Sequence, residues 1–351
     1  SSNNSGTSAP TTQYAGQFWL DTNTPSSTTW TLYMHDGSDD IQFAQIDTSA
    51  NTVNFIDSVV TGALTNKLEG TNFSGSLIVG HDTTGTLSSA ENNTAVGLGS
   101  LDAITSGDNN TALGKDSLTA NTTGSSNVAV GKESLKANTE GSNNIAIGLC
   151  SGLKTTTGQQ NFSAGSFSLC NNTTGCKNVA LGQNAMKAST TGCFNTALGM
   201  NTLALNETAC NNTSIGACSM SSNSTGANNV GVGFCALYTN TTGSNNVGVG
   251  HLSLDANTTG ATNVAVGRGS LGANTTASNN TAVGDLALVA NTTGANNVAI
   301  GRDSLATNTT ASGNTGVGES ALELTTTGCC NTAVGNGALQ ANTTGDDNVA
   351  V

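Results

Sequence analysis

Nine cysteines carry the most reactive side chains of this chain, and seven of them recur at two fixed places in a 17-residue pattern. One place holds Cys176, Cys193, Cys210 and Cys329, and the other holds Cys150, Cys218 and Cys235. Equivalent atoms of stacked repeats lie about 4.8 Å apart, a distance that a disulfide accepts between Cα atoms. In-register stacking points the Cβ atoms in one direction, however, which favours columns of free thiols. Stacked disulfides remain the alternative.

Neither a metal centre nor a hydrolytic site is expected. Zinc requires four converging ligands, and the three histidines lie far apart in the pattern: His35, His81 and His251. A glycosidase requires two carboxylates that face each other across a sugar-sized groove. The carboxylates of the repeats occupy variable positions, expected on a convex surface: Asp102, Asp116, Glu133 and Asp303. The recurring glycine lacks the Gly-Lys-Ser/Thr ending of a phosphate loop, so we expect no enzyme, no cofactor and no metal.

The charge balance argues against nucleic acid as a partner. The 351 residues include 22 Asp and Glu against 9 Lys and Arg, and no Lys or Arg precedes Lys67, whereas nucleic-acid binding needs clustered cations. No apolar run approaches the roughly 20 residues that span a bilayer, so membrane insertion is not expected. The chain lacks an initiator Met, and we interpret it as an internal piece of a longer protein.

The repeat is the element that must position all these residues. A glycine follows a small and an aliphatic residue every 17 residues from Gly97 to Gly335, without insertion or deletion. Fifteen such anchor glycines in one phase indicate near-identical units stacked along an axis. A 17-residue turn is too short to include a helix, and its Gly and Asn residues suit positive φ. The sequence therefore predicts an all-β fold, a parallel β-solenoid or β-roll about 70 Å long.

Each repeat has fixed columns when positions are counted from its anchor glycine. Position −4 is Asn in all sixteen copies, −2 is Ala, Ser or Gly, and −1 is Val, Ile or Leu in every copy except at Ala164. Position +4 is Leu in twelve of fifteen copies. We predict two short strands per coil, one ending before the anchor and one over the Ser-Leu-x-Ala segment after it, with an Asn-Thr-Thr-Gly corner.

The first strand is restricted on both faces, which is typical of a strand buried on both sides. One coil has a single interior, so we expect the aliphatic face to fill the coil and the Asn/small face to pack on symmetry-related copies. Stacked Asn side chains can also form amide ladders. The predicted interface and ladder residues are Asn93, Asn110, Asn127, Asn144, Asn246, Ala129 and Gly248, and the predicted coil core is Val130, Leu135, Val249 and Leu254. A monomeric rod with Asn ladders is the alternative.

The chain before the repeats has a different composition. Residues 1–13 are predicted to be a polar tether, 14–48 a small β-meander with an aromatic core, 49–91 a transition and cap, and 92–351 the solenoid shaft. Strands are expected at residues 18–21, 29–35 and 41–46, from their aromatic and β-branched residues. Residues 76–80 are in phase with the anchors and predict a degenerate first coil.

Two resemblances indicate a class of protein. The order Gly16, Trp19, Asp21, then Leu32-Tyr33 and an Asp36-Gly37 turn, resembles a small module of tailed-bacteriophage fibre proteins over about 35 residues. The pattern Asn-x-Ala-Val-Gly-x-x-Ser-x-x-Ala is similar to the head repeat of trimeric autotransporter adhesins, although that family's repeat is shorter. Repeats of this kind also look like those of long phage tail fibres. These resemblances imply a homotrimeric fibre directed at a cell surface.

We therefore expect the structural shaft of a bacteriophage tail fibre, located in the virion. Its expected partners are copies of itself, other tail or baseplate proteins, and a host receptor reached through a region outside this chain. The alternative is the head region of a trimeric autotransporter-type adhesin on a bacterial surface. Ice or crystal-surface binding is a further alternative, weakened because adjacent threonines of an extended strand point to opposite faces.

Overall fold

A computed structural model describes residues 4–6, 18–21, 29–35, 40–47, 52–55, 66–67, 76–79 and 88–351. The chain divides into two compact units, Ser1–Thr65 and Asn66–Val351. All regular elements among the described residues are strands, in agreement with the predicted all-β class.

The first unit contains one five-stranded sheet in the order β1-β2-β3-β4-β5. Its strands are β1 (Asn4–Gly6), β2 (Phe18–Asp21), β3 (Thr29–His35), β4 (Asp40–Asp47) and β5 (Thr52–Phe55). β2 to β5 pair in antiparallel order, and β1 adds to β2 in parallel. The three predicted strands are present, and the sheet extends on both sides of the predicted module into residues assigned to the tether and the cap.

The aromatic core expected for this small sheet stays a prediction. Among the aromatic side chains that the structure describes there, Phe18 and Trp30 are exposed and Tyr33 is partly buried. The side chains of Trp19 and Phe43 lie outside the described part of the chain.

The second unit is a solenoid with one short strand per coil. Strands β8 to β22 have three residues each and β23 has two: β8 (Thr94–Val96), β9 (Thr111–Leu113), β10 (Val128–Val130), β11 (Ile145–Ile147), β12 (Phe162–Ala164), β13 (Val179–Leu181), β14 (Thr196–Leu198), β15 (Thr213–Ile215), β16 (Val230–Val232), β17 (Val247–Val249), β18 (Val264–Val266), β19 (Thr281–Val283), β20 (Val298–Ile300), β21 (Thr315–Val317), β22 (Thr332–Val334) and β23 (Val349–Ala350). β6 (Asn66–Lys67) and β7 (Leu77–Val79) precede them.

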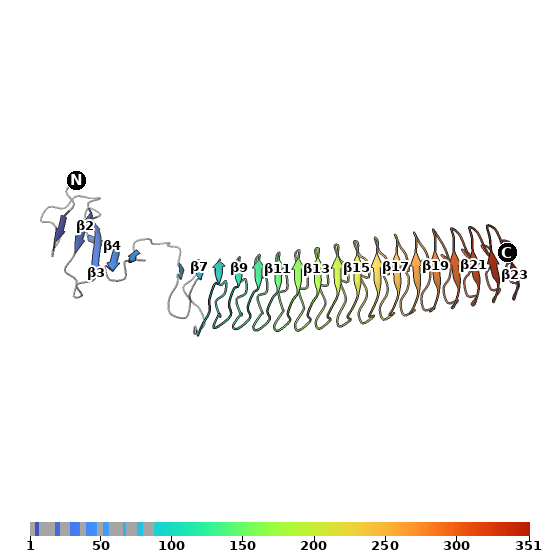
Figure 1. Ribbon diagram of the computed structural model, residues 1–351, viewed down its shortest axis with the longest axis horizontal. Helices are drawn as coiled ribbons and strands as arrows, with labels where there is room; N and C mark the ends of the chain where they lie inside the picture. The colour runs from blue at the N-terminus through green and yellow to red at the C-terminus, as the bar shows by residue number, and fades with distance from the viewer. Residues whose placement is uncertain are drawn as a thin grey trace. The chain divides into compact units, whose positions relative to one another are not determined.

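Strands β7 to β23 form one parallel sheet in which each residue pairs with its equivalent 17 residues later, as Val128 does with Ile145. Figure 1 shows these strands as successive arrows in the same direction, one for each coil. β7 pairs with β8 in this register, which confirms the predicted degenerate first coil. β6 pairs with β7 in the opposite direction and ends the parallel ladder on that side.

The second predicted strand of each coil is wrong, because the Ser-Leu-x-Ala segment forms turns. In the coil of Gly131 the backbone is left-handed at Glu133 and Leu135, with φ of 59° and 48°. Two left-handed residues separated by one other residue cannot continue an extended strand. The segment still donates hydrogen bonds to the next coil, from Leu135 N to Ser151 O (3.0 Å) and from Ala137 N to Leu153 O (3.0 Å).

The core lies inside the coil, between the middle strand position and the wall that carries position +4. Ala129 and Leu135 represent the two sides, with 0% and 2% exposure. The buried apolar side chains form two clusters, one from Ile78 to Ala146 and one from Leu169 to Ala333. The coil between them has Gly152 where the other coils have Leu or Met.

The anchor glycine is required by the close approach of successive backbones. Gly131 has φ of 128°, and a Cβ built on it would lie 2.5 Å from the carbonyl oxygen of Gly148. No side chain fits in that space, and the backbone conformation also favours glycine. This contact repeats along the solenoid and explains the unbroken glycine column.

Candidate interaction surface

The first and last residues of each solenoid strand point out of the coil and form a continuous stripe. We call these residues, at positions −3 and −1 of strands β7 to β23, the outer strand face. In β10, for example, Val128 and Val130 are partly exposed on either side of the fully buried Ala129. The stripe therefore runs along the sheet from coil to coil in the direction of strand pairing.

Position −1 of the outer strand face is apolar although it is exposed or partly exposed in the single chain, whereas position −3 is aliphatic or Phe in some coils and Thr in others, such as Thr111 and Thr196. Leu113, Leu198 and Ile300, all at position −1, are 48%, 45% and 41% exposed. That position is aliphatic in every coil except at Ala164, where Phe162 on the same strand supplies a larger side chain. Exposure to water alone places no such restriction on a position, because isolated surface positions accept polar residues freely. The restriction indicates that something covers this face.

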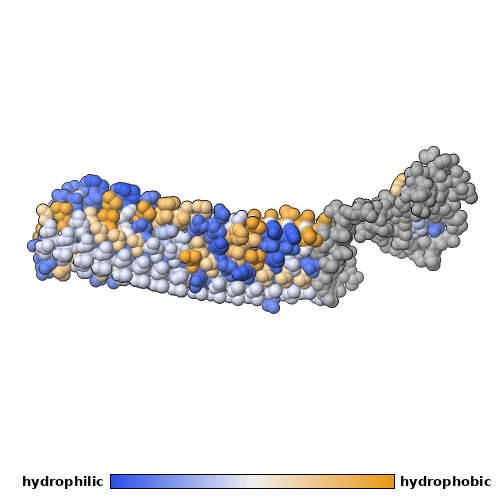
Figure 2. Space-filling view, turned by 180° about the vertical axis from the view of Figure 1, so that it is seen from behind, coloured by the Kyte–Doolittle hydropathy of each residue, from blue (hydrophilic) through white to orange (hydrophobic). Residues whose placement is uncertain are grey.

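The columns beside the outer strand face are not restricted. Position +1, immediately after the anchor, holds Lys132, Gln183, Phe234, His251 and Arg268 in different coils. On the face that Figure 2 presents, separate hydrophobic patches alternate with hydrophilic ones along one edge, above a broad pale area. Position −1 therefore accepts only apolar residues from coil to coil, whereas position +1 accepts the mixture of residues that is usual on a protein surface.

The assignment of the two strand faces in the sequence analysis is wrong. The side chains predicted at the interface between copies are fully buried inside their own coil: Asn93, Asn110, Asn127, Asn144, Asn246 and Ala129. A Cβ added at Gly248 would meet Ser253 Oγ at 3.1 Å and Leu237 Cγ at 3.2 Å, so this position also faces inward. The coil is narrow. Opposite the leucine side chains of position +4, the strand has room inside the coil only for small side chains or for side chains that are hydrogen-bonded.

The predicted coil core is right on one wall and wrong on the other. Leu135 and Leu254 are buried in the coil. Val130 and Val249 are only partly buried and belong to the outer strand face. Sequence reasoning placed the larger aliphatic residues inside because of their hydrophobicity, and it therefore missed the residues that form the candidate surface.

The Asn column at position −4 forms the predicted amide ladder. Asn127 Nδ2 donates to Asn110 Oδ1 (3.1 Å) and to Gly141 O (2.8 Å), and Asn127 N donates to the same Asn110 Oδ1 (3.0 Å). Each side chain thus satisfies the buried backbone of two neighbouring coils. Amide side chains have both the donors and the acceptor that this arrangement needs.

A second buried ladder, at position +7, was not predicted. Asn257 Nδ2 donates to Asn240 Oδ1 (2.8 Å) and to Gly260 O (3.0 Å), and both asparagines are fully buried. The recurrence of Asn as the first residue of the Asn-Thr-Thr-Gly corner was the available signal. The sequence analysis interpreted that Asn as a turn residue, which is its commoner role.

The corner threonines have different environments. Thr122 is partly buried and donates its hydroxyl proton to Thr139 O of the next coil (3.0 Å), whereas Thr123 is exposed. The same bond recurs in most coils, for example from Thr258 to Thr275 O (3.0 Å). The first threonine therefore stabilises stacking and does not present a free hydroxyl donor.

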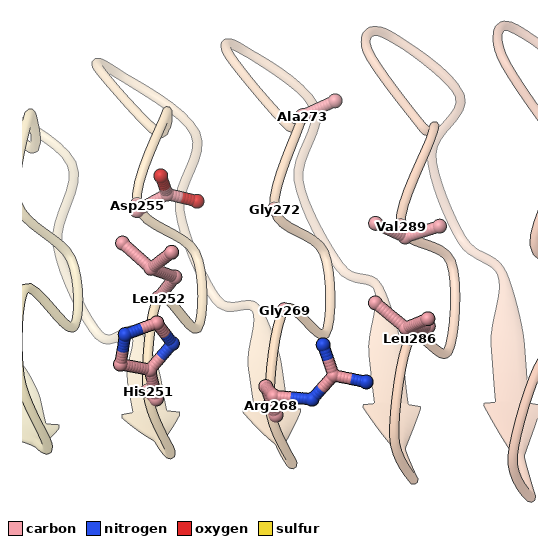
Figure 3. Close-up of a pocket in the computed structure, with 9 residues that line it drawn as sticks. All are labelled: His251, Leu252, Asp255, Arg268, Gly269, Gly272, Ala273, Leu286 and Val289. Atoms are coloured by element: carbon pink, nitrogen blue, oxygen red, sulfur yellow. The ribbon is translucent and has the colours of Figure 1, made fainter.

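A groove is present on the surface of the coils around Gly269 and Gly272. Gly269 and Gly272 leave a gap between Asp255 on one side and Leu286 and Val289 on the other, as Figure 3 shows, with a volume of about 410 Å³. Partial burial raises the pKa of the Asp255 carboxyl, and the nearby His251 acts in the opposite direction. Arg268 also lines the groove, but its guanidinium group pairs with Asp285 (2.8 Å), and the groove carries no functional assignment.

Two of the ion pairs in the described part of the chain join equivalent positions of adjacent coils. Arg268 Nη2 lies 2.8 Å from Asp285 Oδ2, and Arg302 pairs with Glu319. Lys136 contacts Glu133 within its own coil (3.3 Å) and holds the pKa of that carboxyl below its usual range. Among the described residues, no group of three or more His, Cys, Asp and Glu is arranged to hold a metal.

Comparison with known proteins gave no match to a protein family, a curated protein or a solved structure. Within the described ranges there is no helix that could cross a membrane.

Proposed function

We propose that this chain is the structural shaft of a fibre in which copies of the chain pack against each other through the outer strand face. The observation that carries the proposal is the aliphatic restriction of exposed position −1 along the whole solenoid. An apolar stripe of this length is unusual on an isolated soluble protein and is typical of an interface.

The partner that fits this stripe best is another copy of the same chain. Aliphatic side chains recur along it at the strand spacing of about 4.8 Å. A partner can meet them coil by coil over the full length only if it has the same repeat. A second solenoid of this sequence meets that condition, because the register of every strand pair is the same from β7 to β22.

The complete proposal is a homotrimeric shaft of a bacteriophage tail fibre. The trimer and the virion location come from the resemblances of the repeats and of the module around Trp19 and Tyr33. In this assembly the shaft holds a receptor-binding tip, outside this chain, at a distance from the tail or baseplate. Its contribution is mechanical, because the coils are joined by buried ladders and the copies by an apolar stripe.

The test of the interface places lysine on the outer strand face of alternate coils. We expect Leu198→Lys, Val232→Lys and Val266→Lys together to leave the coil folded, because these side chains point outward. They should prevent assembly, because burying three unpaired charges is strongly unfavourable. Circular dichroism measures the fold, and light scattering coupled to size-exclusion chromatography measures the mass.

The matched control places lysine at position +1, where Gln183→Lys and His251→Lys lie on the unrestricted column. The control should keep the mass of the parent chain. If the outer-face variant is folded and keeps the parent's assembly state, the interface lies elsewhere. The viral setting has its own test: antibodies to the solenoid should label virion tails in electron micrographs, and labelling of the bacterial surface alone would favour the adhesin alternative.

A further inference from the structure

Three cysteines in consecutive coils form a sulfur column on the solenoid. Cys176, Cys193 and Cys210 occupy position −6 of their coils, 17 residues apart, and all three are partly exposed. The Sγ atoms of Cys176 and Cys193 lie 2.8 Å apart. Parallel Cβ directions did not favour a bond on sequence grounds, but here the side chains bring the two sulfur atoms into contact.

The backbone holds each sulfur in place from the preceding coil. Cys176 N donates to Cys193 Sγ (3.1 Å), and Cys193 N donates to Cys210 Sγ (3.1 Å). In five other coils the same position is serine and makes the same contact, as from Ser125 N to Ser142 Oγ (3.0 Å) and from Ala261 N to Ser278 Oγ (3.0 Å). The column therefore works equally well with hydroxyls, and its stacking does not require thiols.

We propose that these three residues are a redox-active thiol ladder in which a disulfide forms between Cys176 and Cys193 and staples two coils together. Strand-paired coils place their Cα atoms at about 4.8 Å, inside the range that a disulfide accepts. Cys193 is the central residue, because it alone has a cysteine in both adjacent coils. Cys176 and Cys210 are two coils apart, at about 9.6 Å, which is beyond that range.

The oxidant that the proposal names is a low-molecular-weight disulfide, R–S–S–R. The thiolate of one cysteine attacks it, the S–S bond breaks, and a mixed disulfide and one RS⁻ result. The thiolate of the neighbouring cysteine then attacks the protein sulfur of the mixed disulfide and releases the second RS⁻. Two protein thiols lose two protons and two electrons, and R–S–S–R becomes two RSH.

Cys210 supplies an exchange partner for the staple. Its thiolate can attack Cys193 Sγ, form a Cys193–Cys210 bond and release Cys176, which moves the staple by one coil. Burial raises the pKa of the Cys193 thiol, with the contact to Cys176 acting in the same direction. Formation of the Cys176–Cys193 disulfide should therefore become faster as the pH is raised from neutral, because the thiolate is the attacking species.

The test exposes the folded full-length chain to oxidised glutathione, blocks free thiols under denaturing conditions and maps the peptides by mass spectrometry. Trypsin, which cuts after Lys177 and Lys187, together with a glutamyl endopeptidase, which cuts after Glu207, places the three cysteines on separate peptides. We expect a peptide that links Cys176 to Cys193. Fragmentation distinguishes Cys176 from Cys170 on the same peptide.

Serine variants provide matched controls, because serine is the alternative residue of this column. Cys210→Ser should keep the Cys176–Cys193 link, Cys176→Ser should move the link to Cys193–Cys210, and Cys193→Ser should abolish both. Three free thiols after treatment of the folded parent, or a persistent Cys176–Cys210 link in Cys193→Ser, would overturn the proposal. Stable mixed disulfides with glutathione at Cys193, without closure, would also overturn it.

Discussion

Buried amide side chains join neighbouring coils, and the structure shows where one of the two ladders is broken. At position +7 the ladder is interrupted at Thr155, Ser189 and Thr325. Asn172 Oδ1 and Ser189 Oγ, on adjacent coils at such a break, are both buried and have no hydrogen-bond partner among the described residues. Serine has no amide group to reach back to the preceding asparagine, so two polar atoms lose water without compensation.

The variant Ser189→Asn should repair this break. Its Nδ2 is placed to donate to Asn172 Oδ1, as Asn257 does to Asn240 (2.8 Å). We expect the free energy of unfolding to increase by about 1–2 kcal/mol, from satisfying two buried polar atoms. Chemical denaturation followed by circular dichroism measures the change.

The control for this prediction is Ser126→Asn, the same substitution at an exposed position where half of the coils already have Asn. It should alter stability by less than about 0.5 kcal/mol. A Ser189→Asn variant that is no more stable than this control would show that the break is not a defect.

Asp255 gives a pH-dependent prediction at the glycine-lined groove. Because burial raises its pKa above the ordinary 3.8, the folded chain holds the proton more tightly than the unfolded chain does. The contribution of the Asp255 carboxyl to the free energy of unfolding is fully present below about pH 4, where the carboxyl is protonated. This contribution is lost as the pH rises through the pKa of the folded chain. We expect Asp255→Asn to be more stable than the parent at pH 7 and equal to it near pH 3.

Denaturation midpoints measured across this range check the prediction for Asp255. The exposed variant Glu140→Gln is the control for the loss of one negative charge from a strongly acidic chain. A stabilisation of Asp255→Asn that persists at pH 3 would contradict the proposed cause.

At the scale of the coil, hydrophobic pattern predicted the repeat unit but not its internal geometry. The columns established the coil length, the parallel register and the ladder at Asn127, because these depend only on equivalent residues stacking. The left-handed backbone at Leu135 could not be predicted, because leucine rarely adopts a positive φ. An extended strand was therefore the simpler interpretation of the Ser-Leu-x-Ala segment. That conformation turns the leucine into the coil, so only small residues such as Ala129 fit opposite it.

The same geometry explains why the candidate surface was misplaced. Larger aliphatic residues are normally the buried ones, and Val130 and Val249 were therefore predicted inside. In a coil whose interior is already filled by leucine from the facing wall, the strand's aliphatic residues can only point outward. The sequence shows that both faces of this strand accept few residue types. It does not show that the Asn and small residues face inward and the aliphatic residues face outward.

One coil should be less stable than the others. Gly152 replaces the core leucine, and Ser163, on the strand β12 that follows it, replaces the usual small apolar residue of the strand. Ser151 Oγ lies 2.7 Å from Ser163 Oγ and 2.9 Å from Ser168 Oγ, so a polar cluster separates the two apolar clusters. The loss of one buried leucine side chain is worth roughly 2–5 kcal/mol.

Native-state hydrogen exchange tests this difference. Backbone amides of β12 (Phe162–Ala164) should exchange on the order of tenfold to a hundredfold faster than those of β18 (Val264–Val266). The reason is that local opening at the polar cluster exposes less apolar surface and therefore costs less free energy. Equal protection of the two strands would show that the ladders, and not the core, set local stability.

For the whole molecule, we expect copies of the same chain to cover the stripe that a single chain leaves exposed. Sedimentation equilibrium of the full chain, without denaturant and at micromolar concentration, measures the mass of the assembly. We expect a mass three times that of the 34.7 kDa chain. A single species of 34.7 kDa whose mass does not change with concentration would show that the stripe stays uncovered.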